Sequence, residues 1–218
     1  MISSFNFLQK HSNIALGYFV LIAFLGVLLR LFSVIDLPIN YRFTVHSHSH
    51  VALLGWVYTG LTTLIFKMYL TKVAIIIKYK RLFWCTQIII IGMLITFPFT
   101  GYAFFSILFS SLFLIASYVF TFLVFKYTSA LQKKTYSYKC TRIALWYMII
   151  SSIGPWALGI IIKTTGSGSD LYRNAIYFYL HFQYNGWFIL ALFGVFFYFL
   201  EHHKILLPKK TFQFFFWL

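Results

Sequence analysis

The sequence predicts an all-α protein, a polytopic membrane bundle of six transmembrane helices with its N-terminus in the cytoplasm. Of the 218 residues, 61% are hydrophobic and only 10% are charged, against roughly 25% charged residues in soluble domains. The mean hydropathy is +0.83. Six apolar stretches each reach the roughly 20 residues that a helix needs to cross a bilayer. This composition excludes a soluble globular enzyme and a disordered tail.

The first three spans are expected at residues 13–35, 44–70 and 82–100. The first is interpreted as a retained span rather than a cleaved signal peptide. Its apolar run exceeds the about 7–15 residues typical of a signal peptide, and no cleavage site of small residues follows it. Residues 71–81 are predicted to form a polar inner loop before the third span.

The last three spans are expected at residues 104–127, 141–163 and 173–201. Residues 128–140 are predicted as a second inner loop, and residues 164–170 as a flexible outer connection. The serines, glycine and proline of residues 151–155 predict a kink in the fifth span, because proline leaves a backbone carbonyl unpaired. Residues 211–218 are typical of the start of an incomplete seventh span. We expect residues 1–218 to form a single transmembrane domain.

The basic residues predict the orientation of the spans. With the N-terminus inside, only Arg30, Arg42, Lys163 and Arg173 lie outside, and the inner segments hold the other 14 Lys and Arg. Such an excess follows the positive-inside rule, and we expect a protein of the bacterial inner (plasma) membrane. The rule also accounts for the net charge of +15, so the lipid bilayer and not nucleic acid is the expected partner.

Three histidines alternate with serines near the outer end of the second span: His46, His48 and His50. At 100° per residue, His46 and His50 share one helix face, whereas His48 lies about 160° from each of them. Neutral imidazole is the commonest metal ligand in proteins. Three histidines within five positions therefore indicate a metal or haem site rather than interfacial residues.

The sixth span carries the second polar signal, because His181, Gln183 and Asn185 interrupt an apolar run. His50 is predicted roughly 9 Å below the outer end of its span and His181 roughly 12 Å below the outer end of its own. The two imidazoles would lie in one layer and could serve one centre. Hydrogen bonding between helices is the alternative role for these side chains.

The remaining histidines are not assigned to a site. His202 and His203 are predicted at the inner end of the sixth span, about 31 Å along the axis from His181. His11 is predicted to lie in the N-terminal tail. The sequence contains no CxxCH, which excludes covalent attachment of a c-type haem.

The run from His48 to Trp56 resembles the HxH-plus-Gly helix of the catalytic subunits of haem-copper oxidases and nitric oxide reductases. The run from His181 to Trp187 is similar to the helix of that family whose histidine binds the non-haem metal. The resemblance implies a non-covalent b-type haem on His48 and His50, and copper or non-haem iron on His181. It implies electron transfer or chemistry on oxygen or nitric oxide, with a quinol or cytochrome as electron donor.

Two arginines at the outer ends of the histidine-bearing spans, Arg42 and Arg173, are candidate partners for haem propionates. Arg42 before His46 also resembles the family's second helix, in which one haem ligand follows an arginine. The choice of ligands among the three histidines of the second span therefore stays open. The family has about twice as many spans, so the resemblance implies a truncated or half-length relative that needs a partner subunit or a second copy.

Two further functions are consistent with the sequence. In a divalent-metal or proton-coupled transporter, His46 and His50 would chelate the ion as an i, i+4 pair. In a non-catalytic structural or assembly subunit, the polar residues would only hold the helices together.

Overall fold

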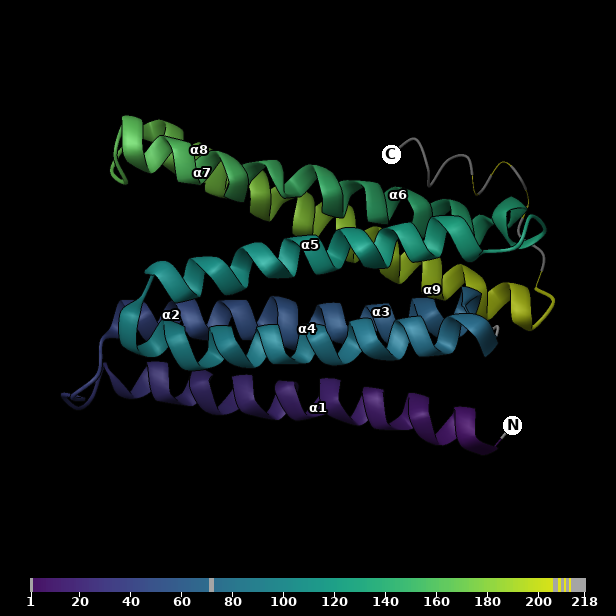
Figure 1. Cartoon of the computed structure of the whole chain (residues 1–218), viewed down its shortest axis with the longest axis horizontal. Helices are drawn as coiled ribbons and strands as arrows, with labels where there is room; N and C mark the ends of the chain where they lie inside the picture. The colour runs from purple at the N-terminus through teal and green to yellow at the C-terminus, as the bar shows by residue number, and fades with distance from the viewer. Residues whose placement is uncertain (1, 71–72, 206–207, 209, 211, 213–218) are drawn as a thin grey trace. The chain divides into compact units, whose positions relative to one another are not determined.

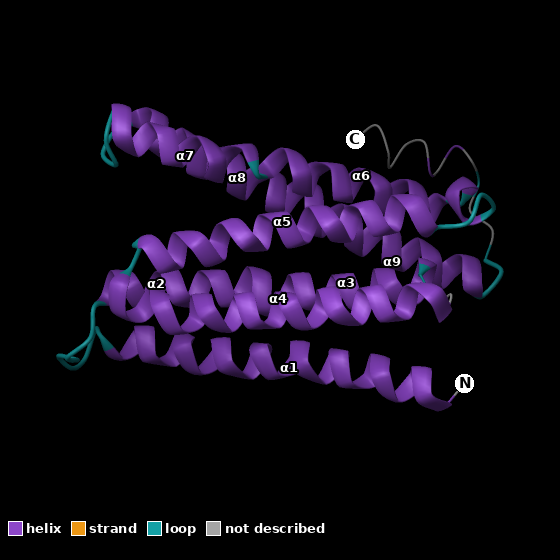
Figure 2. Ribbon diagram, viewed as in Figure 1, coloured by secondary structure: helices purple, strands orange, loops and turns teal. Residues whose placement is uncertain are grey.

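A computed structural model describes residues 2–70, 73–205, 208, 210 and 212, and the chain divides into two compact units, Met1–Val124 and Phe125–Leu218. All regular structure in this part of the chain is helical (Figure 2), without a β-strand. Six helices in the described part are long and apolar enough to cross a membrane. The predicted fold class and the predicted number of spans are therefore confirmed.

The first unit contains four spans, in which the second is continuous but changes its helix type twice. Its elements are α1 (Ile2–Leu31), α2 (Tyr41–His50), the π-helix η1 (Val51–Tyr58), α3 (Thr59–Tyr69), α4 (Val73–Thr100) and most of α5 (Phe104–Tyr127). Helix α1 packs against η1 and α3, and α2 packs against α4 (Figure 1). Gly55 permits the close approach of η1 to α1, because a Cβ atom there would lie 3.0 Å from the ring of Tyr18.

The second unit is built on a pair of antiparallel spans. Its elements are the short 3₁₀ helix η2 (Gln132–Lys134), α6 (Tyr136–Ser151), α7 (Ile153–Thr164), α8 (Asp170–His181), the π-helix η3 (Phe182–Phe188) and α9 (Ile189–His202). Helix α6 packs against η3 and α9, and α7 packs against α8. The fifth span is interrupted at Ser152, between α6 and α7, at the place where the sequence predicts a kink. The hydroxyls of Ser151 and Ser152 each donate to a carbonyl three residues earlier, at 2.7 and 2.5 Å.

Two predicted inner loops are shorter in the structure than in the prediction. Helix α4 begins at Val73, so most of the predicted loop 71–81 is helical, and α6 begins at Tyr136, inside the predicted loop 128–140. Basic residues do not end a helix at the membrane surface, because their long side chains reach water while the backbone stays helical. The side chain of Thr135 accepts a hydrogen bond from the Tyr138 N–H and caps α6.

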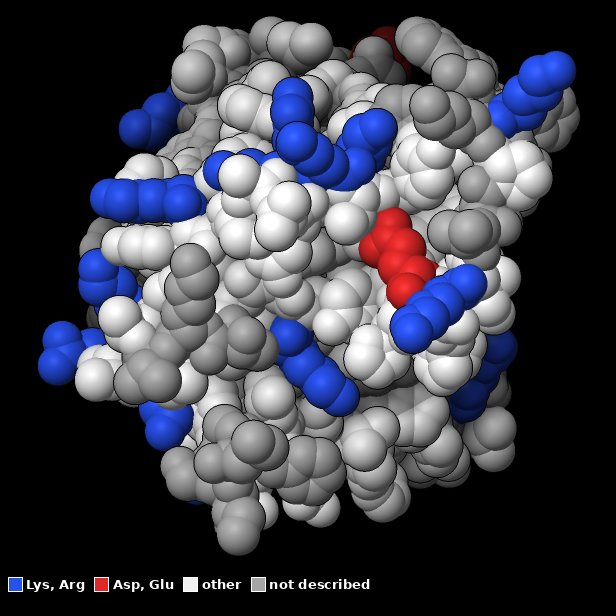
Figure 3. Space-filling view, turned by 90° about the vertical axis from the view of Figure 1, so that its right-hand side faces the viewer, with Lys and Arg blue, Asp and Glu red and all other residues white. Residues whose placement is uncertain are grey.

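Other boundaries differ at the ends of the chain. Helix α1 begins before residue 13 and ends at Leu31, so the prediction that His11 lies in an N-terminal tail is wrong. Of the predicted seventh span, residues 211 and 213–218 lie outside the described residues. The single domain and the cytoplasmic N-terminus stay predictions. The face shown in Figure 3 carries many Lys and Arg side chains and little Asp or Glu.

Glu201, near the end of α9, ties the two spans of the second unit together. Its carboxylate accepts from the Ser137 backbone N–H at 3.1 Å and from the Ser137 hydroxyl at 2.6 Å, in the first turn of α6. The Ser137 side chain is fully buried. We expect Glu201→Leu to lower the free energy of unfolding by about 2–3 kcal/mol, since it removes the charged acceptor of two buried donors.

A detergent-solubilised sample titrated with a denaturing detergent measures this loss, with Asp170→Asn as the matched control. Asp170 is the first residue of α8 and is likewise an acidic group near a helix end, but its ion pair with Arg173 is exposed, and such pairs contribute about 0.2–1 kcal/mol. Equal stabilities of the two variants would contradict the role of Glu201.

Candidate functional site

The three histidines of the second span lie on a helix whose polar groups are largely satisfied within the helix. The Asn40 side chain caps α2 by accepting from the Phe43 N–H at 3.1 Å. The Thr44 hydroxyl donates to the Asn40 carbonyl at 2.9 Å, and the Ser49 hydroxyl donates to the His46 carbonyl at 3.0 Å. These threonine and serine hydroxyls bond backbone carbonyls and not the imidazoles.

His50 is held in one orientation and one tautomer by its own helix. Its Nδ1 lies 2.8 Å from the His46 backbone oxygen. Because a carbonyl oxygen only accepts, Nδ1 carries the proton, and the lone pair of the neutral ring is on Nε2. A ring held in this way is typical of metal-ligating histidines. The ring centroid lies 4.3 Å from that of Phe97 on α4.

His46 and His48 lie on opposite sides of α2. The ring centroid of His46 lies 4.7 Å from that of Tyr102, and the ring centroid of His50 lies 6.0 Å from that of the same tyrosine. His46 and His50 therefore share one helix face, as the sequence predicts. His48 faces α1 instead, where its Cε1 lies 3.5 Å from the position of a Cβ atom at Gly26. The buried His48 Nδ1 has no hydrogen-bond partner among the described residues.

His181 has a different environment in the second unit. It is exposed, and the Asn185 side-chain nitrogen lies 3.2 Å from its Nδ1. An amide nitrogen donates, which places the proton of the neutral ring on Nε2, whereas a half-turn of the amide would make Nδ1 the donor and free Nε2. The adjacent Gln183 is buried and donates to the Ser151 hydroxyl at 3.0 Å, so hydrogen bonding between helices does describe this side chain.

The structure reveals a common local arrangement in the two units. His50 immediately precedes the π-helix η1, and His181 immediately precedes the π-helix η3. Both are followed by Gly and Trp at the same spacing, since His50-x4-Gly55-Trp56 is matched by His181-x4-Gly186-Trp187. Short π-helical segments are rare, and those that occur are frequently at functional sites. The repeated His-x4-Gly-Trp spacing is a signal in the sequence that becomes visible only when the second and sixth spans are compared with each other.

The two arrangements belong to different units. Within the described residues, no group of three or more His, Cys, Asp or Glu side chains is placed to hold a metal ion. The assignment of His48, His50 and His181 to one haem and metal centre therefore stays a prediction. The same holds for the chelating pair formed by His46 and His50.

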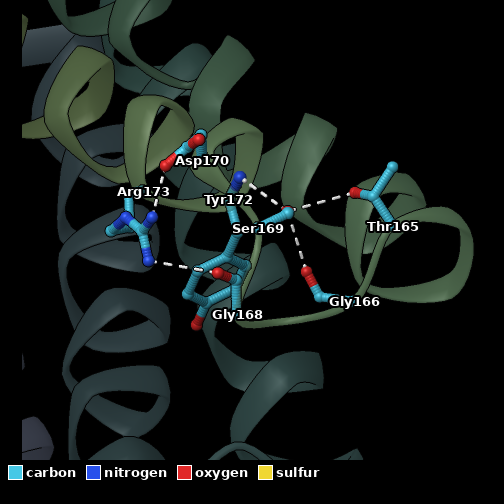
Figure 4. A network of polar contacts seen from close by, with 7 residues as sticks. All are labelled: Thr165, Gly166, Gly168, Ser169, Asp170, Tyr172 and Arg173. Carbon is cyan, nitrogen blue, oxygen red and sulfur yellow. Dashed lines mark hydrogen bonds and ion pairs between the residues drawn. The ribbon is translucent and has the colours of Figure 1, made fainter.

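The two candidate propionate partners are both exposed. Arg173 pairs with Asp170 and donates to the Gly168 carbonyl at 3.1 Å, as Figure 4 shows. In the same network, the Ser169 hydroxyl donates to Gly166 O and its oxygen accepts from the Tyr172 N–H. Arg173 is thus already held by the outer connection, and Arg42 has no ion-pair partner in the described part of the chain. Their binding of propionates stays a prediction.

His11 was not assigned to a site from the sequence, yet it is among the most buried polar side chains. Its side chain is 1% exposed. Its ring stacks on that of Phe83 with 3.4 Å between the ring centroids, and the Phe7 ring packs edge-on against it with 4.1 Å between the centroids. Its Nδ1 has no hydrogen-bond partner among the described groups. Phe7, four residues earlier on α1, and Phe83 on α4 form this enclosure. In the sequence, these residues have the same apolar pattern as any other helix–helix contact, so the burial of His11 could not be predicted.

Comparison with known proteins adds no assignment. The sequence matches no protein-family model, and neither the curated proteins nor the solved structures include a similar chain. The chain is an integral membrane helix bundle by its own structure. Any more specific function is inferred from the site.

Proposed function

We propose that this protein is a membrane haem protein of the haem-copper oxidase type, which takes part in electron transfer or in chemistry on oxygen or nitric oxide. The observation that carries the proposal is the repeated arrangement of a histidine at the start of a π-helix with Gly and Trp after it, once in each unit. Irregular backbone is costly inside a bilayer. Its occurrence after both histidines favours a role beyond packing.

The histidines of the second span fit a haem. His50 presents a lone pair on Nε2, because the His46 carbonyl accepts a hydrogen bond from Nδ1–H. A hydrogen bond of this kind from the non-ligating nitrogen raises the basicity of a ligating imidazole. His48 carries a buried Nδ1 on the opposite face, beside a glycine of α1, and this atom has no hydrogen-bond partner in the part of the chain that the structure describes. Two imidazoles directed to opposite sides of one helix can serve two different centres.

When bound, haem supplies reversible one-electron transfer and the capacity to bind diatomic gases. The chain would supply the ligand nitrogens, the aromatic side chains of Phe97 and Tyr102 beside His50, and a membrane environment that excludes water. His181 would hold copper or non-haem iron. The electron donor would be a quinol or a cytochrome, a partner subunit or second copy would complete the pocket, and the location would be a bacterial plasma membrane.

A structural or assembly subunit is the second candidate. The buried bond between Gln183 and Ser151 favours it, because this bond joins η3 to α6, as interhelical hydrogen bonds in membrane bundles do.

The first experiment is a reduced-minus-oxidised visible spectrum of the protein purified from haem-replete membranes. We expect sharp haem bands, with about one or two haems for each chain. A colourless, folded protein with no bound copper or iron by elemental analysis would overturn the haem proposal and support the structural subunit.

A further inference from the structure

A second polar site, separate from the histidines, lies at the middle of the membrane-spanning part of the first unit. A cavity of about 10 Å³ lies between the second span, α4 and α5. Its polar lining comes from Tyr58 of η1, from Thr59 and Thr62 of α3, and from Tyr79, Thr86 and Gln87 of α4. Gln87 is the thirteenth residue after Ala74, where the 27-residue third span begins. The cavity is therefore near the centre of the bilayer.

Gln87 is the residue that the packing leaves unsatisfied. It is 3% exposed, and its Oε1 has no hydrogen-bond partner among the described groups. A buried amide oxygen without a partner is costly, and at this depth bulk water cannot reach it. The equally buried Gln183 of the second unit, in contrast, is bonded to Ser151 at 3.0 Å. Gln87 Oε1 is therefore an acceptor that the described side chains and backbone leave open for a further partner.

The lining groups define the chemistry of that partner. The hydroxyls of Thr62 and Thr86 donate to the carbonyls of Tyr58 and Leu82, at 2.7 and 2.8 Å. The oxygens of these two hydroxyls can therefore only accept hydrogen bonds from a group in the cavity, and the same is true of Gln87 Oε1. These three oxygens offer acceptors to a ligand that donates hydrogen bonds, and the Tyr58 hydroxyl and the Gln87 amide group add donors to the same lining. Because no Asp or Glu lines it, a cation would enter without a compensating charge.

We propose that this cavity binds one water molecule, which donates to Gln87 Oε1 and to a threonine hydroxyl of the lining. The volume is close to the minimum of roughly 10–15 Å³ that a single water requires, and it excludes larger ligands. Buried waters of this kind have two to four polar partners, which the lining supplies. The site depends on α3, α4 and α5 alone and does not rest on haem binding.

Radiolytic hydroxyl-radical labelling tests the proposal directly, because a bound water labels the side chains beside it. Phe120 lines the cavity and Phe113 does not, although both are on α5 and are 1% and 3% exposed. We expect Phe120 to be labelled faster than Phe113 in the intact protein. Equal labelling of the two phenylalanines would overturn the proposal.

The variant Gln87→Met removes the acceptor at nearly constant volume, with Gln183→Met as its matched control. With water bound, Gln87→Met loses a satisfied hydrogen bond, so we expect the excess labelling of Phe120 to disappear and the melting temperature not to rise. Without water, the same change removes an unpaired amide, and the melting temperature would rise. Gln183→Met breaks a direct bond and lowers the melting temperature in either case. The labelling of the parent protein decides the question if the variant does not fold.

Discussion

Replacing His50 with alanine is expected to abolish the haem absorption assigned to its centre while the six-span bundle persists. The imidazole offers Nε2 as a ligand, and the neighbouring histidines do not occupy its place, because His46 lies one helical turn away and His48 lies on the opposite face. The hydrogen bond to the His46 carbonyl is lost as well, at a cost of about 1 kcal/mol in stability. The reduced-minus-oxidised spectrum of the purified variant measures the loss.

His203 provides a matched control for this experiment. Its Nδ1 also bonds a carbonyl four residues earlier, Phe199 O at 2.9 Å, but it follows α9 and precedes no π-helix. His203→Ala should therefore keep the full spectrum. If the haem bands of His50→Ala were the same as those of the parent protein, His50 would not be a haem ligand.

His46→Ala separates the haem proposal from a metal transporter. The bond to His50 comes from the backbone of residue 46, so this variant keeps the orientation of the His50 ring. Retained haem bands would agree with ligation by His48 and His50. Loss of tightly bound zinc in His46→Ala, measured by elemental analysis of a colourless protein, would instead support the chelating pair.

Gly154→Leu is expected to be among the most destabilising single substitutions in the chain. A Cβ atom at residue 154 would lie 2.5 Å from the backbone oxygen of Ala175 and 3.0 Å from the Cβ of Tyr179. Backbone cannot yield as a flexible side chain does, so α7 and α8 would have to separate. We expect a loss of about 3 kcal/mol in unfolding free energy, at the upper end for overpacking.

Gly159 is the control for Gly154, because it lies on the same helix and has nothing within 4 Å of an added Cβ atom. Gly159→Leu carries the same change in composition and helix propensity into open space facing lipid. Titration with denaturing detergent, followed by circular dichroism, should show a large loss for residue 154 and little change for residue 159. Similar midpoints for the two variants would contradict tight packing between α7 and α8.

The sequence was sufficient for the class of fold because hydropathy over about 20 residues depends on the solvent rather than on tertiary packing. The break of the fifth span at Ser152 was also predictable, from serine, glycine and proline within five residues. Helix ends near the basic residues were not, since Val73 and Tyr136 start helices inside segments that composition describes as loops.

The candidate site was predicted in part. The shared face of His46 and His50 and the opposite face of His48 follow from 100° per residue and agree with their ring contacts. The tautomer of His50 and the enclosure of His11 depend on contacts at atomic distance, which a one-dimensional pattern does not contain. The π-helices also depend on packing, although the repeated His-x4-Gly-Trp spacing marks where they occur.

The contact between Glu201 and Ser137 has a consequence for how the chain is made. The two residues are 64 positions apart, so during synthesis the first turn of α6 lacks its carboxylate partner until the end of α9 has been added. At about 5–20 residues per second, that interval lasts roughly 3–13 s. The fifth span must therefore enter the membrane without the two hydrogen bonds from Ser137 to Glu201. These bonds form only when the sixth span packs against it.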